Sequence, residues 1–343
     1  MSQGTARRVR AVVVDAPGAH RVVSGPPPPP GPGEVRVAVH AAGVCASDRE
    51  VWQGTRAEGY VRYPVVPGHE WAGTVEAVGE GVDPALLQRR TVAEGFRACR
   101  RCTRCREGAT SLCAGGYDET GFTRPGGFAD TLVVPADLLH LLPDDADLRA
   151  AALLEPAAVA AAAVLAGAPQ PGERIAVLGA GTLGQLAVRL LAASSPAELL
   201  AVDPRPAARE RARSMGATVE CADSPTDEPG WDLVVEAAGA RSTARDACLL
   251  ARRGGRVVLT GMFADGAEGI DPVHLSVSQL TVRSVFGASS AAWSHAVRAF
   301  STGVLPPPAV ASLITHELPF TEFPAAMALV GEGGTGKVLL RPD

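Results

Sequence analysis

The 343-residue sequence contains few aromatic residues, no long uninterrupted apolar run and no excess of positive charge. Aromatic residues make up 4% of the chain, which does not favour a large apolar substrate pocket. The formal net charge is −5, whereas a nucleic-acid-binding protein normally carries a strongly basic face. We therefore expect no nucleic-acid partner and look for a small polar ligand instead.

We also expect no segment that would target the chain or anchor it in a membrane. Met1–Arg10 contains no apolar segment, so no secretory signal is expected. The most apolar stretch, residues 150–168, is interrupted by Glu155 and Pro156, and the remainder is too short to cross a bilayer. We predict a buried, alanine-rich helix there, no membrane partner and a cytoplasmic location.

Four of the seven cysteines lie within fifteen residues. In a cytoplasmic protein such a cluster indicates a metal site rather than disulfides, with a redox cluster or plain packing as the alternative. Four thiolates complete the tetrahedral coordination of zinc, so the site would be closed and structural. The predicted ligands of this zinc are Cys99, Cys102, Cys105 and Cys113.

Two different patterns of secondary structure divide the chain, and a chain of this length is expected to form two domains. The first 140 residues suggest a small β-barrel or sandwich, with a stiff proline-rich connector at residues 24–33. Its predicted strands are Val9–Asp15, Glu34–Ala41, Trp71–Val78, Val92–Gly95 and Phe128–Pro135.

From Glu173 onward short apolar strands alternate with helical stretches, which is typical of an α/β fold with a doubly wound parallel sheet. The predicted strands are Arg174–Leu178, Glu198–Val202, Asp232–Glu236 and Arg256–Leu259. The helices between them are expected at Thr182–Ala193, Pro206–Met215 and Thr243–Ala251. The tail, with a strand at Lys337–Leu340, is expected to return to the first domain.

A G-x-G-x-x-G run, Gly179-Ala180-Gly181-Thr182-Leu183-Gly184, follows the first of these strands and opens a helix, which is the context that a dinucleotide site requires. Gly179 permits the tight turn, Gly181 lets the backbone approach the pyrophosphate, and Gly184 allows helix and strand to pack closely. Asp203 ends the next strand and would hold the ribose hydroxyls, which favours NAD over NADP. Arg205 and Arg209 nearby either soften that preference or are simply solvated.

A second metal site is indicated by residues that are far apart in the sequence. Cys45, His69, Glu70 and Glu155 provide a thiolate, an imidazole and two carboxylates. This is the ligand mixture of an open zinc site, in which one position is left for water or substrate.

The ordered set of motifs resembles the zinc-dependent medium-chain alcohol and polyol dehydrogenases. The resemblance runs through residues 43–48, 67–70, the four-cysteine lobe, 154–156, 179–184, 236–239 and 336–338. It implies a GroES-like β-barrel catalytic domain over residues 1–153 and 300–343, with a structural zinc lobe at 95–115. A Rossmann NAD-binding domain would cover 154–299, and the chain would bind two zinc ions and NAD.

The resemblance also implies roles for the site residues. Cys45 and His69 would be ligands of the catalytic zinc, and Glu155 stands where the polyol branch has a glutamate. Glu70 would be a direct or alternating ligand, and the order in which the two carboxylates bind stays open. Asp48 would accept a hydrogen bond from the His69 ring and fix its tautomer.

The implied reaction is hydride transfer from an alcohol carbon to the nicotinamide, with zinc lowering the pKa of the substrate hydroxyl. Ser47 would hydrogen-bond the reacting oxygen and pass its proton outward. Relatives often have a histidine three residues after this serine, where this chain has Glu50. Glu50 either relays the proton, leaves this to water, binds a substrate amine or is a plain surface glutamate.

For the substrate, a polyhydroxylated or amino-bearing alcohol would suit Glu50 and Glu119. Residues 63–71 and 121–126 are similar to the 2-deoxy-scyllo-inosamine dehydrogenases of antibiotic biosynthesis, which oxidise an aminocyclitol hydroxyl to a ketone. Sorbitol-type polyols and L-threonine are the alternatives. A non-catalytic NAD- and zinc-binding sensor, or a zinc-free reductase, is disfavoured because the ligand residues are present. The family forms dimers or tetramers, and Leu280–Phe286 is the predicted contact strand.

Overall fold

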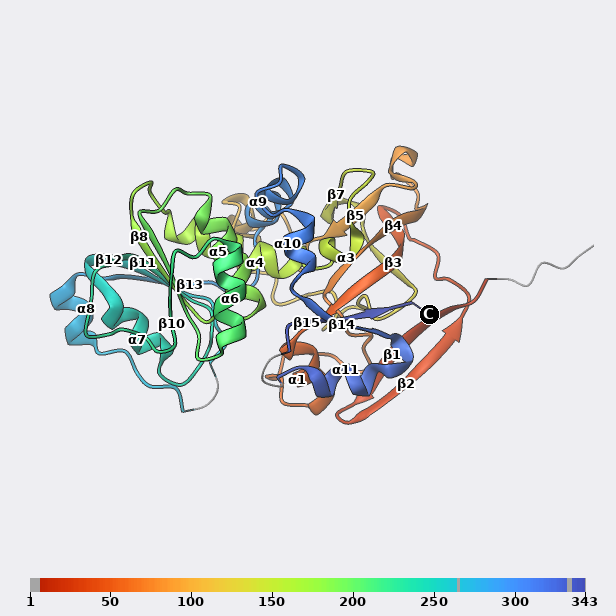
Figure 1. Cartoon of the computed structure of the whole chain (residues 1–343). Coiled ribbons are helices and arrows are strands. Elements are labelled where there is room, and N and C mark those ends of the chain that lie inside the picture. The colour runs from red at the N-terminus through yellow and green to blue at the C-terminus, as the bar shows by residue number, and fades with distance from the viewer. Residues whose placement is uncertain (1–6, 264–265, 332–334, 343) are drawn as a thin grey trace, which may run out of the picture. The chain divides into compact units, whose positions relative to one another are not determined.

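A computed structural model describes residues 7–263, 266–331 and 335–342. Residues 1–6, part of the segment in which no secretory signal is expected, lie outside the described residues. The chain forms two compact units, one of residues 1–155 with 310–343 and the other of residues 156–309 (Figure 1). The sequence predicts the return to the first unit at residue 300. In the structure the chain returns at Val310, because helix α9 (Ser290–Ser301) still belongs to the second unit.

The first unit is built on a seven-stranded sheet. Its strand order is β14-β15-β3-β4-β5-β7, with β6 paired to β3, and all neighbours are antiparallel except β14 and β15. The strands are β3 (Glu34–Val44), β4 (Glu70–Val78), β5 (Arg90–Ala93), β6 (Thr131–Pro135), β7 (Leu139–Leu141), β14 (Ile314–Pro319) and β15 (Lys337–Arg341). A separate hairpin joins β1 (Val9–Ala16) and β2 (Ala19–Gly25).

The core of the first unit follows from the alternation of apolar residues along β3. Val35, Val37 and Val39 are buried and pack with Trp71 and Phe128 in one cluster. Each such side chain contributes about 1.5–3 kcal/mol on burial. The helices of the unit are short: α1 (Ala46–Gln53), α2 (Thr103–Arg106), α3 (Leu148–Ala151) and α11 (Phe323–Leu329), with 3₁₀ turns at Pro84–Leu86, Thr110–Leu112, Ala136–Leu138 and Phe320–Glu322.

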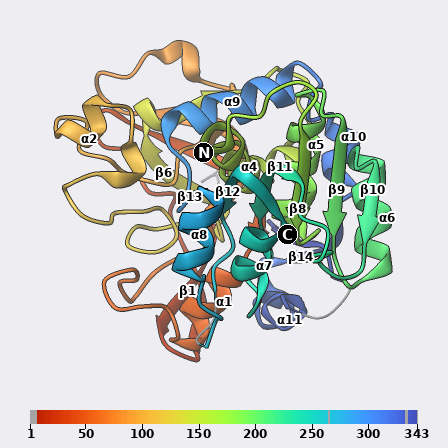
Figure 2. The ribbon, with the colours of Figure 1, turned by 90° about the vertical axis from the view of Figure 1, so that its left-hand side faces the viewer.

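The second unit contains a parallel six-stranded sheet in the order β10-β9-β8-β11-β12-β13 (Figure 2). Numbered along the chain this is 3-2-1-4-5-6, the order of dinucleotide-binding doubly wound sheets, so the predicted fold is confirmed. The strands are β8 (Arg174–Leu178), β9 (Glu198–Val202), β10 (Val219–Cys221), β11 (Trp231–Glu236), β12 (Ala251–Leu259) and β13 (Thr281–Ser284). The other helices are α5 (Thr182–Ala192), α6 (Pro206–Met215), α7 (Thr243–Leu250) and α8 (Pro272–Ser278), and two more, α4 (Leu154–Gly167) and α10 (Pro307–Ala311), include residues of both units.

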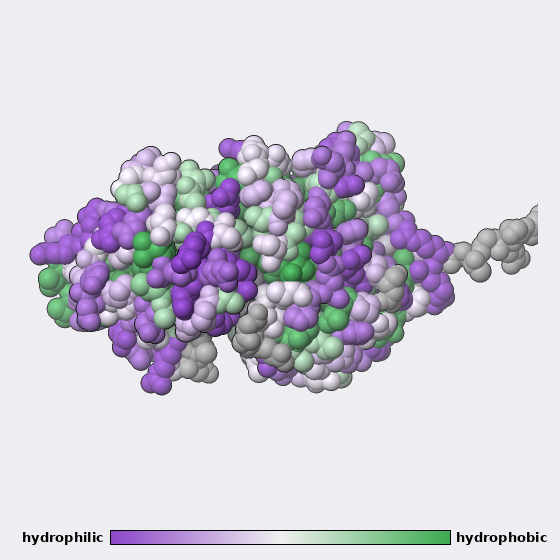
Figure 3. Space-filling view, viewed as in Figure 1, coloured by the Kyte–Doolittle hydropathy of each residue, from purple (hydrophilic) through white to green (hydrophobic). Residues whose placement is uncertain are grey.

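The surface is mostly hydrophilic on the face shown in Figure 3, where apolar residues form only small patches. Among the described residues, no helix has the length and apolar character that crossing a bilayer requires. The predicted alanine-rich helix is α4, which spans Leu154–Gly167 and includes Glu155 and Pro156 in its first turn.

Candidate metal centre and dinucleotide cleft

The candidate metal centre begins where strand β3 passes into helix α1. Cys45 is the N-cap of α1, and Asp48, in the first turn, accepts a hydrogen bond of 2.9 Å from the Cys45 backbone N–H. Ser47 lies between them, with its hydroxyl oxygen 3.4 Å from the Cys45 sulfur. The start of one short helix therefore fixes both the predicted thiolate ligand and the predicted proton carrier.

Asp48 connects this helix to the segment that carries His69. Its carboxylate is fully buried, accepts a hydrogen bond of 3.1 Å from the Gly68 N–H, and lies 3.4 Å from Nδ1 of His69. Burial lowers the pKa of His69, but the charge and hydrogen bonding of Asp48, together with those of Cys45, outweigh burial and raise that pKa well above its usual range. Because Nδ1 faces Asp48, Nε2 is the ring nitrogen left for a metal.

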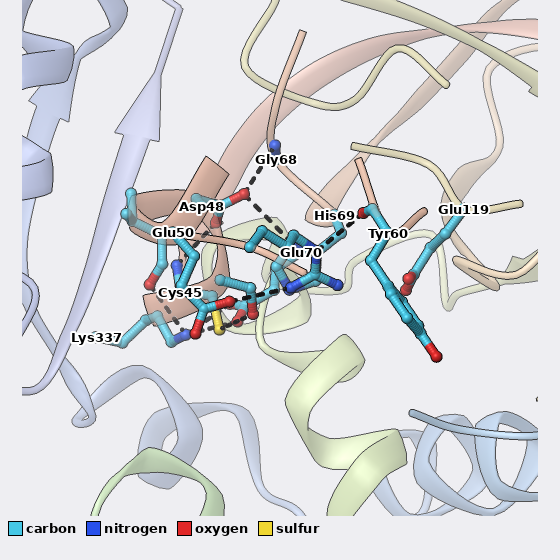
Figure 4. Close-up of polar contacts among 12 residues, drawn as sticks. Cys45, Asp48, Glu50, Tyr60, Gly68, His69, Glu70, Glu119 and Lys337 are labelled. Carbon is cyan, nitrogen blue, oxygen red and sulfur yellow. Dashed lines mark hydrogen bonds and ion pairs between the residues drawn. The ribbon is translucent and has the colours of Figure 1, made fainter. Parts of the chain in front are cut away.

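Glu70 begins strand β4 and lies opposite Gly43 of β3. A Cβ atom at Gly43 would approach the Glu70 Oε2 to 2.1 Å, so only glycine leaves room for this carboxylate. The buried Lys337 on β15 lies 2.7 Å from both carboxylate oxygens, donating to Oε1, and donates at 3.3 Å to the Val44 carbonyl (Figure 4). Lys337 is thus a site residue, although its sequence pattern predicts only the start of a strand.

The ligand atoms of Cys45, His69 and Glu70 all lie within 4.8 Å of one another. The buried Oε2 of Glu70 lies 2.7 Å from the Lys337 ammonium but accepts no well-directed hydrogen bond from the described residues, so it has a lone pair available for a metal. A thiolate, an imidazole and a carboxylate at this spacing fit zinc, which accepts sulfur, nitrogen and oxygen ligands.

The fourth predicted ligand, Glu155, lies in the first turn of helix α4 but is not in this close group. Desolvation, together with the charges of Glu70 and Glu119, raises the pKa of Glu155 to about 8. The Glu155 carboxylate is thus near the centre, and of the two predicted carboxylates the structure brings Glu70 into ligand distance of Cys45 and His69.

Glu50, one turn further along α1, forms an ion pair with Arg56. The Arg56 Nη1 lies 3.3 Å from the Glu50 carboxylate, and the Glu50 side chain is 44% exposed. Arg56 also donates to the Tyr117 hydroxyl at 3.0 Å. The carboxylate that replaces the relay histidine of relatives is therefore already partnered by a guanidinium.

The Arg56 guanidinium stacks over the Phe122 ring, 3.8 Å from its centroid, and Phe122 in turn packs against His69 at 4.7 Å between centroids. The Tyr117 hydroxyl donates to the carboxylate of Glu119, which is 6% exposed. We call Glu50, Arg56, Tyr117, Glu119 and Phe122 the polar wall. The sequence predicted only its two glutamates, because arginine and tyrosine in a loop carry no pattern that reveals their partners.

The four-cysteine lobe contains the second candidate metal site. The four sulfur atoms lie within 4.8 Å of one another, with Cys102 to Cys105 at 3.5 Å and Cys99 to Cys105 at 4.0 Å. A tetrahedral zinc with bonds of about 2.3 Å would separate its sulfur ligands by about 3.8 Å, so the spacing fits. Backbone N–H groups of Arg101 and Cys102 lower the pKa of Cys99 to about 6, which favours the thiolate that zinc requires.

In the second unit, the glycine run lines a cleft of about 570 Å³. A Cβ atom at Gly184 would lie 1.8 Å from the Gly179 carbonyl, whereas one at Gly181 would meet nothing within 4 Å. Helix α5 begins at Thr182, followed by Leu183, and no side chain caps its first N–H groups. Free N–H groups beside an uncluttered backbone fit the pyrophosphate of a dinucleotide.

Asp203 directly follows β9 and lines the same cleft, as the sequence predicts for the ribose-binding acid. Its carboxylate is 2% exposed and accepts hydrogen bonds from the Ala180 N–H at 2.9 Å and from Arg205. Three Arg205 donors reach it: the backbone N–H at 3.0 Å, Nε at 2.8 Å and Nη2 at 2.8 Å. Although burial raises the pKa of Asp203, Arg205 lowers it below the usual range.

Two family models match the chain. The model described as "Alcohol dehydrogenase GroES-like domain" matches residues 31–144, and the one described as "Zinc-binding dehydrogenase" matches residues 182–302. These matches confirm the predicted pair of folds.

The chain is also similar to individual proteins over nearly its whole length. It is 30% identical to an L-threonine 3-dehydrogenase of Bacillus subtilis (strain 168), with 90% of this chain and 91% of the relative covered. It is 28% identical to a sorbitol dehydrogenase of the same strain, with 83% and 84% covered. Among solved structures, a zinc-binding dehydrogenase from Sinorhizobium meliloti 1021 bound to NADP has a TM-score of 0.90 at 27% identity and covers 98% of this chain and 100% of its own.

Proposed function

This chain belongs to the zinc-dependent medium-chain alcohol dehydrogenases, and on that basis we propose that it oxidises a secondary alcohol of a polar polyol or aminocyclitol to a ketone. As a member of this family it is an oxidoreductase that uses zinc and a nicotinamide dinucleotide. The observation that carries the proposal is the close group of Cys45, His69 and Glu70, with Ser47 beside the thiolate.

When bound, zinc supplies a Lewis acid that acidifies the alcohol, and the nicotinamide accepts the hydride. Cys45, His69 and Glu70 would hold the metal, with Glu155 as the alternating carboxylate. Asp48 fixes the His69 ring through its contact with Nδ1. The Ser47 hydroxyl, 3.4 Å from the Cys45 sulfur, would take the substrate proton and pass it outward.

The polar wall supports an amino-bearing substrate. It contains two carboxylates, Glu50 and Glu119, and one guanidinium, Arg56, so its net charge is one negative unit when both glutamates are ionised. Because Arg56 already balances Glu50, Glu119 is the carboxylate that an ammonium group of the substrate would balance. An aminocyclitol such as 2-deoxy-scyllo-inosamine carries such a group next to oxidisable hydroxyls.

L-Threonine and sorbitol are the second candidates, and the similarity to an L-threonine 3-dehydrogenase and a sorbitol dehydrogenase favours them. L-Threonine also carries an ammonium group, so the charge of the polar wall suits it as well. Sorbitol is neutral and would leave the Glu119 charge without a partner.

The test is NADH formation by the purified zinc-loaded protein with 2-deoxy-scyllo-inosamine, sorbitol and L-threonine. We expect the aminocyclitol to have the highest kcat/KM. A preference for sorbitol or L-threonine would keep the reaction and discard the antibiotic-biosynthesis role. Failure with every alcohol tested would contradict the catalytic proposal in favour of a sensor.

The variant Glu119→Gln should raise KM for an amino-bearing substrate about tenfold, because one charge-assisted contact is lost. The amide oxygen of the new side chain can still accept the Tyr117 hydrogen bond, so the fold is preserved. Glu107→Gln, on the exposed lobe where Glu107 pairs with Arg104, is the matched control and should leave KM unchanged.

We also propose that the protein is a dimer or tetramer. Strand β13 is an edge of the six-stranded sheet, and exposed apolar side chains lie close to it in the sequence: Val273, Val277 and Phe286. Exposed edges with apolar neighbours are typical of strand-to-strand contacts between subunits. Light scattering on the purified protein tests this, and a monomer at micromolar concentration would contradict it.

A further inference from the structure

The ribose-binding acid of the dinucleotide cleft has no acceptor position left. An ionised carboxylate offers about four lone-pair sites. The Asp203 carboxylate accepts four hydrogen bonds, one from Ala180 and three from Arg205. For the two ribose hydroxyls of NAD to donate to Asp203, the Arg205 side chain would first have to leave it.

The Arg205 side chain also changes the charge of this subsite. A bare carboxylate repels a 2′-phosphate, and this repulsion is the physical basis for choosing NAD. Here the guanidinium lies within 2.8 Å of the carboxylate, so the pair is neutral as a whole. With Arg205 beside it, Asp203 therefore repels a 2′-phosphate much less than a bare carboxylate would.

Arg205 keeps donors available for an anion. A guanidinium has five N–H donors, of which Asp203 takes the Nε–H and one from Nη2. The Arg205 side chain is 41% exposed and lines the cleft, so its outer edge faces the space that a dinucleotide would enter. This edge matches the bidentate geometry by which arginine binds phosphate oxygens.

The other arginines near the cleft are engaged elsewhere. Arg209 donates to the backbone carbonyls of Asp203 and Pro204, which holds the turn in place. Arg245 also lines the cleft but is paired with Asp246 and Glu268. Of these three arginines, Arg205 is the one that lies beside the ribose-binding acid and still has N–H groups directed into the cleft.

We propose that Arg205 is a specificity-determining residue that makes the cleft accept a 2′-phosphorylated dinucleotide, so that the chain binds NADP as well as NAD. The inference concerns the cofactor subsite alone and holds for any alcohol substrate. It rests on the second unit, whereas the proposed reaction rests on the metal centre of the first.

The test is direct calorimetric titration of NAD⁺ and NADP⁺ into the wild-type protein and into Arg205→Ser. Arg205 is the N-cap of helix α6 and makes no capping hydrogen bond with its side chain. Serine is a favourable N-cap residue, so the substitution is compatible with the fold. Arg213→Ser is the matched control, because Arg213 lies on the same helix, is 67% exposed and pairs with Glu220 outside the cleft lining.

We expect wild-type Kd values for NAD⁺ and NADP⁺ to lie within about tenfold of each other, a difference of about 1.4 kcal/mol. Arg205→Ser should raise the ratio of the NADP⁺ to the NAD⁺ Kd at least about fivefold, while Arg213→Ser leaves it unchanged. A smaller change in Arg205→Ser, including equal weakening of both cofactors, would overturn the proposal. The titration needs no alcohol, so a failure to find the substrate does not affect it.

A second readout separates a charge effect from a structural one. If Arg205 contacts the 2′-phosphate, NADP⁺ binding should weaken more than NAD⁺ binding as salt is added, because the extra contact is screened. In Arg205→Ser the two salt dependences should converge. Parallel salt dependences in the wild type would contradict the assignment.

Discussion

The four-cysteine lobe and the Cys45–His69–Glu70 group both fit zinc but are constructed in opposite ways. The lobe takes four identical ligands from residues 99–113, and backbone N–H groups of the same segment stabilise its sulfurs. The other group takes three different ligands from two segments. Buried side chains hold them in place, Asp48 behind the histidine and Lys337 behind the carboxylate.

On the proposed roles, this difference would separate a metal that holds a loop from a metal that takes part in chemistry. Four thiolates leave zinc no open position, whereas three protein ligands leave one for a substrate oxygen. The ion pair between Glu70 and Lys337 gives the carboxylate a second partner, so that it can bind the metal or leave it. We therefore expect substitutions in the two groups to have different effects on activity and on stability.

The largest effect is expected from Cys45→Ser. Loss of the thiolate removes the metal that acidifies the alcohol, a contribution of several kcal/mol, so kcat/KM should fall about 10³-fold or more. Dinucleotide binding should persist, because the cleft lies in the other unit. Kinetics and calorimetric titration measure the two properties on one preparation. Turnover close to that of the wild type would contradict the assignment of Cys45 as a ligand of the catalytic zinc.

Lys337→Met should destabilise the metal-free protein by about 3–5 kcal/mol, because it leaves the buried Glu70 carboxylate without its cation. The loss should be clearly smaller in zinc-loaded protein, where the metal replaces the ammonium as the partner of Glu70. Denaturant unfolding of both forms measures this difference. Equal losses with and without zinc would mean that Glu70 does not reach the metal.

Cys105→Ser tests the proposed structural role of the four-cysteine lobe. It should release one zinc and make residues 95–115 sensitive to proteolysis, because the metal is the main link in this segment. Since the lobe donates no ligand to the other group, kcat/KM should stay within about fivefold of wild type. A loss as large as that of Cys45→Ser would show that the two groups are not independent.

The smallest effect is expected at Glu317, which pairs with Arg149 and Arg341 away from both metal groups. Although burial raises the pKa of Glu317, the two arginines lower it below the usual range. Its stabilisation is therefore present above pH of about 4.3 and is lost as pH falls through the lowered pKa. Glu317→Gln should cost about 1–2 kcal/mol at pH 7, with unchanged zinc content, and the difference from wild type should shrink at pH 3. A difference independent of pH would contradict the pairing.

The sequence predicted best what local pattern controls. Strands β8 and β9 have the predicted bounds, because continuous apolar runs between helices mark buried parallel strands. Strand β2 was not predicted, because its largely exposed residues show no clear alternation of apolar and polar side chains. The lobe cysteines were found because their spacing is itself the signal.

Long-range partners could not be predicted in the same way. Lys337 looks like the start of an ordinary strand, and only the pairing of β15 with β3 brings it to Glu70. Arg56 and Tyr117 are far apart in the sequence and meet only through loop packing. Asp203 and Arg205 are close in the sequence. The number of hydrogen bonds that the Asp203 carboxylate accepts nevertheless depends on backbone geometry, which the residue types do not reveal.

The most direct test of two zinc sites with different roles is stepwise chelation, with zinc content and NADH formation measured on the same samples. We predict two zinc ions per chain, loss of activity with the first ion removed, and recovery when zinc is added back, while the second ion stays in the lobe until its thiols are modified. Activity that survives the loss of the first ion, or a fully active protein with one zinc held by the lobe, would contradict this account.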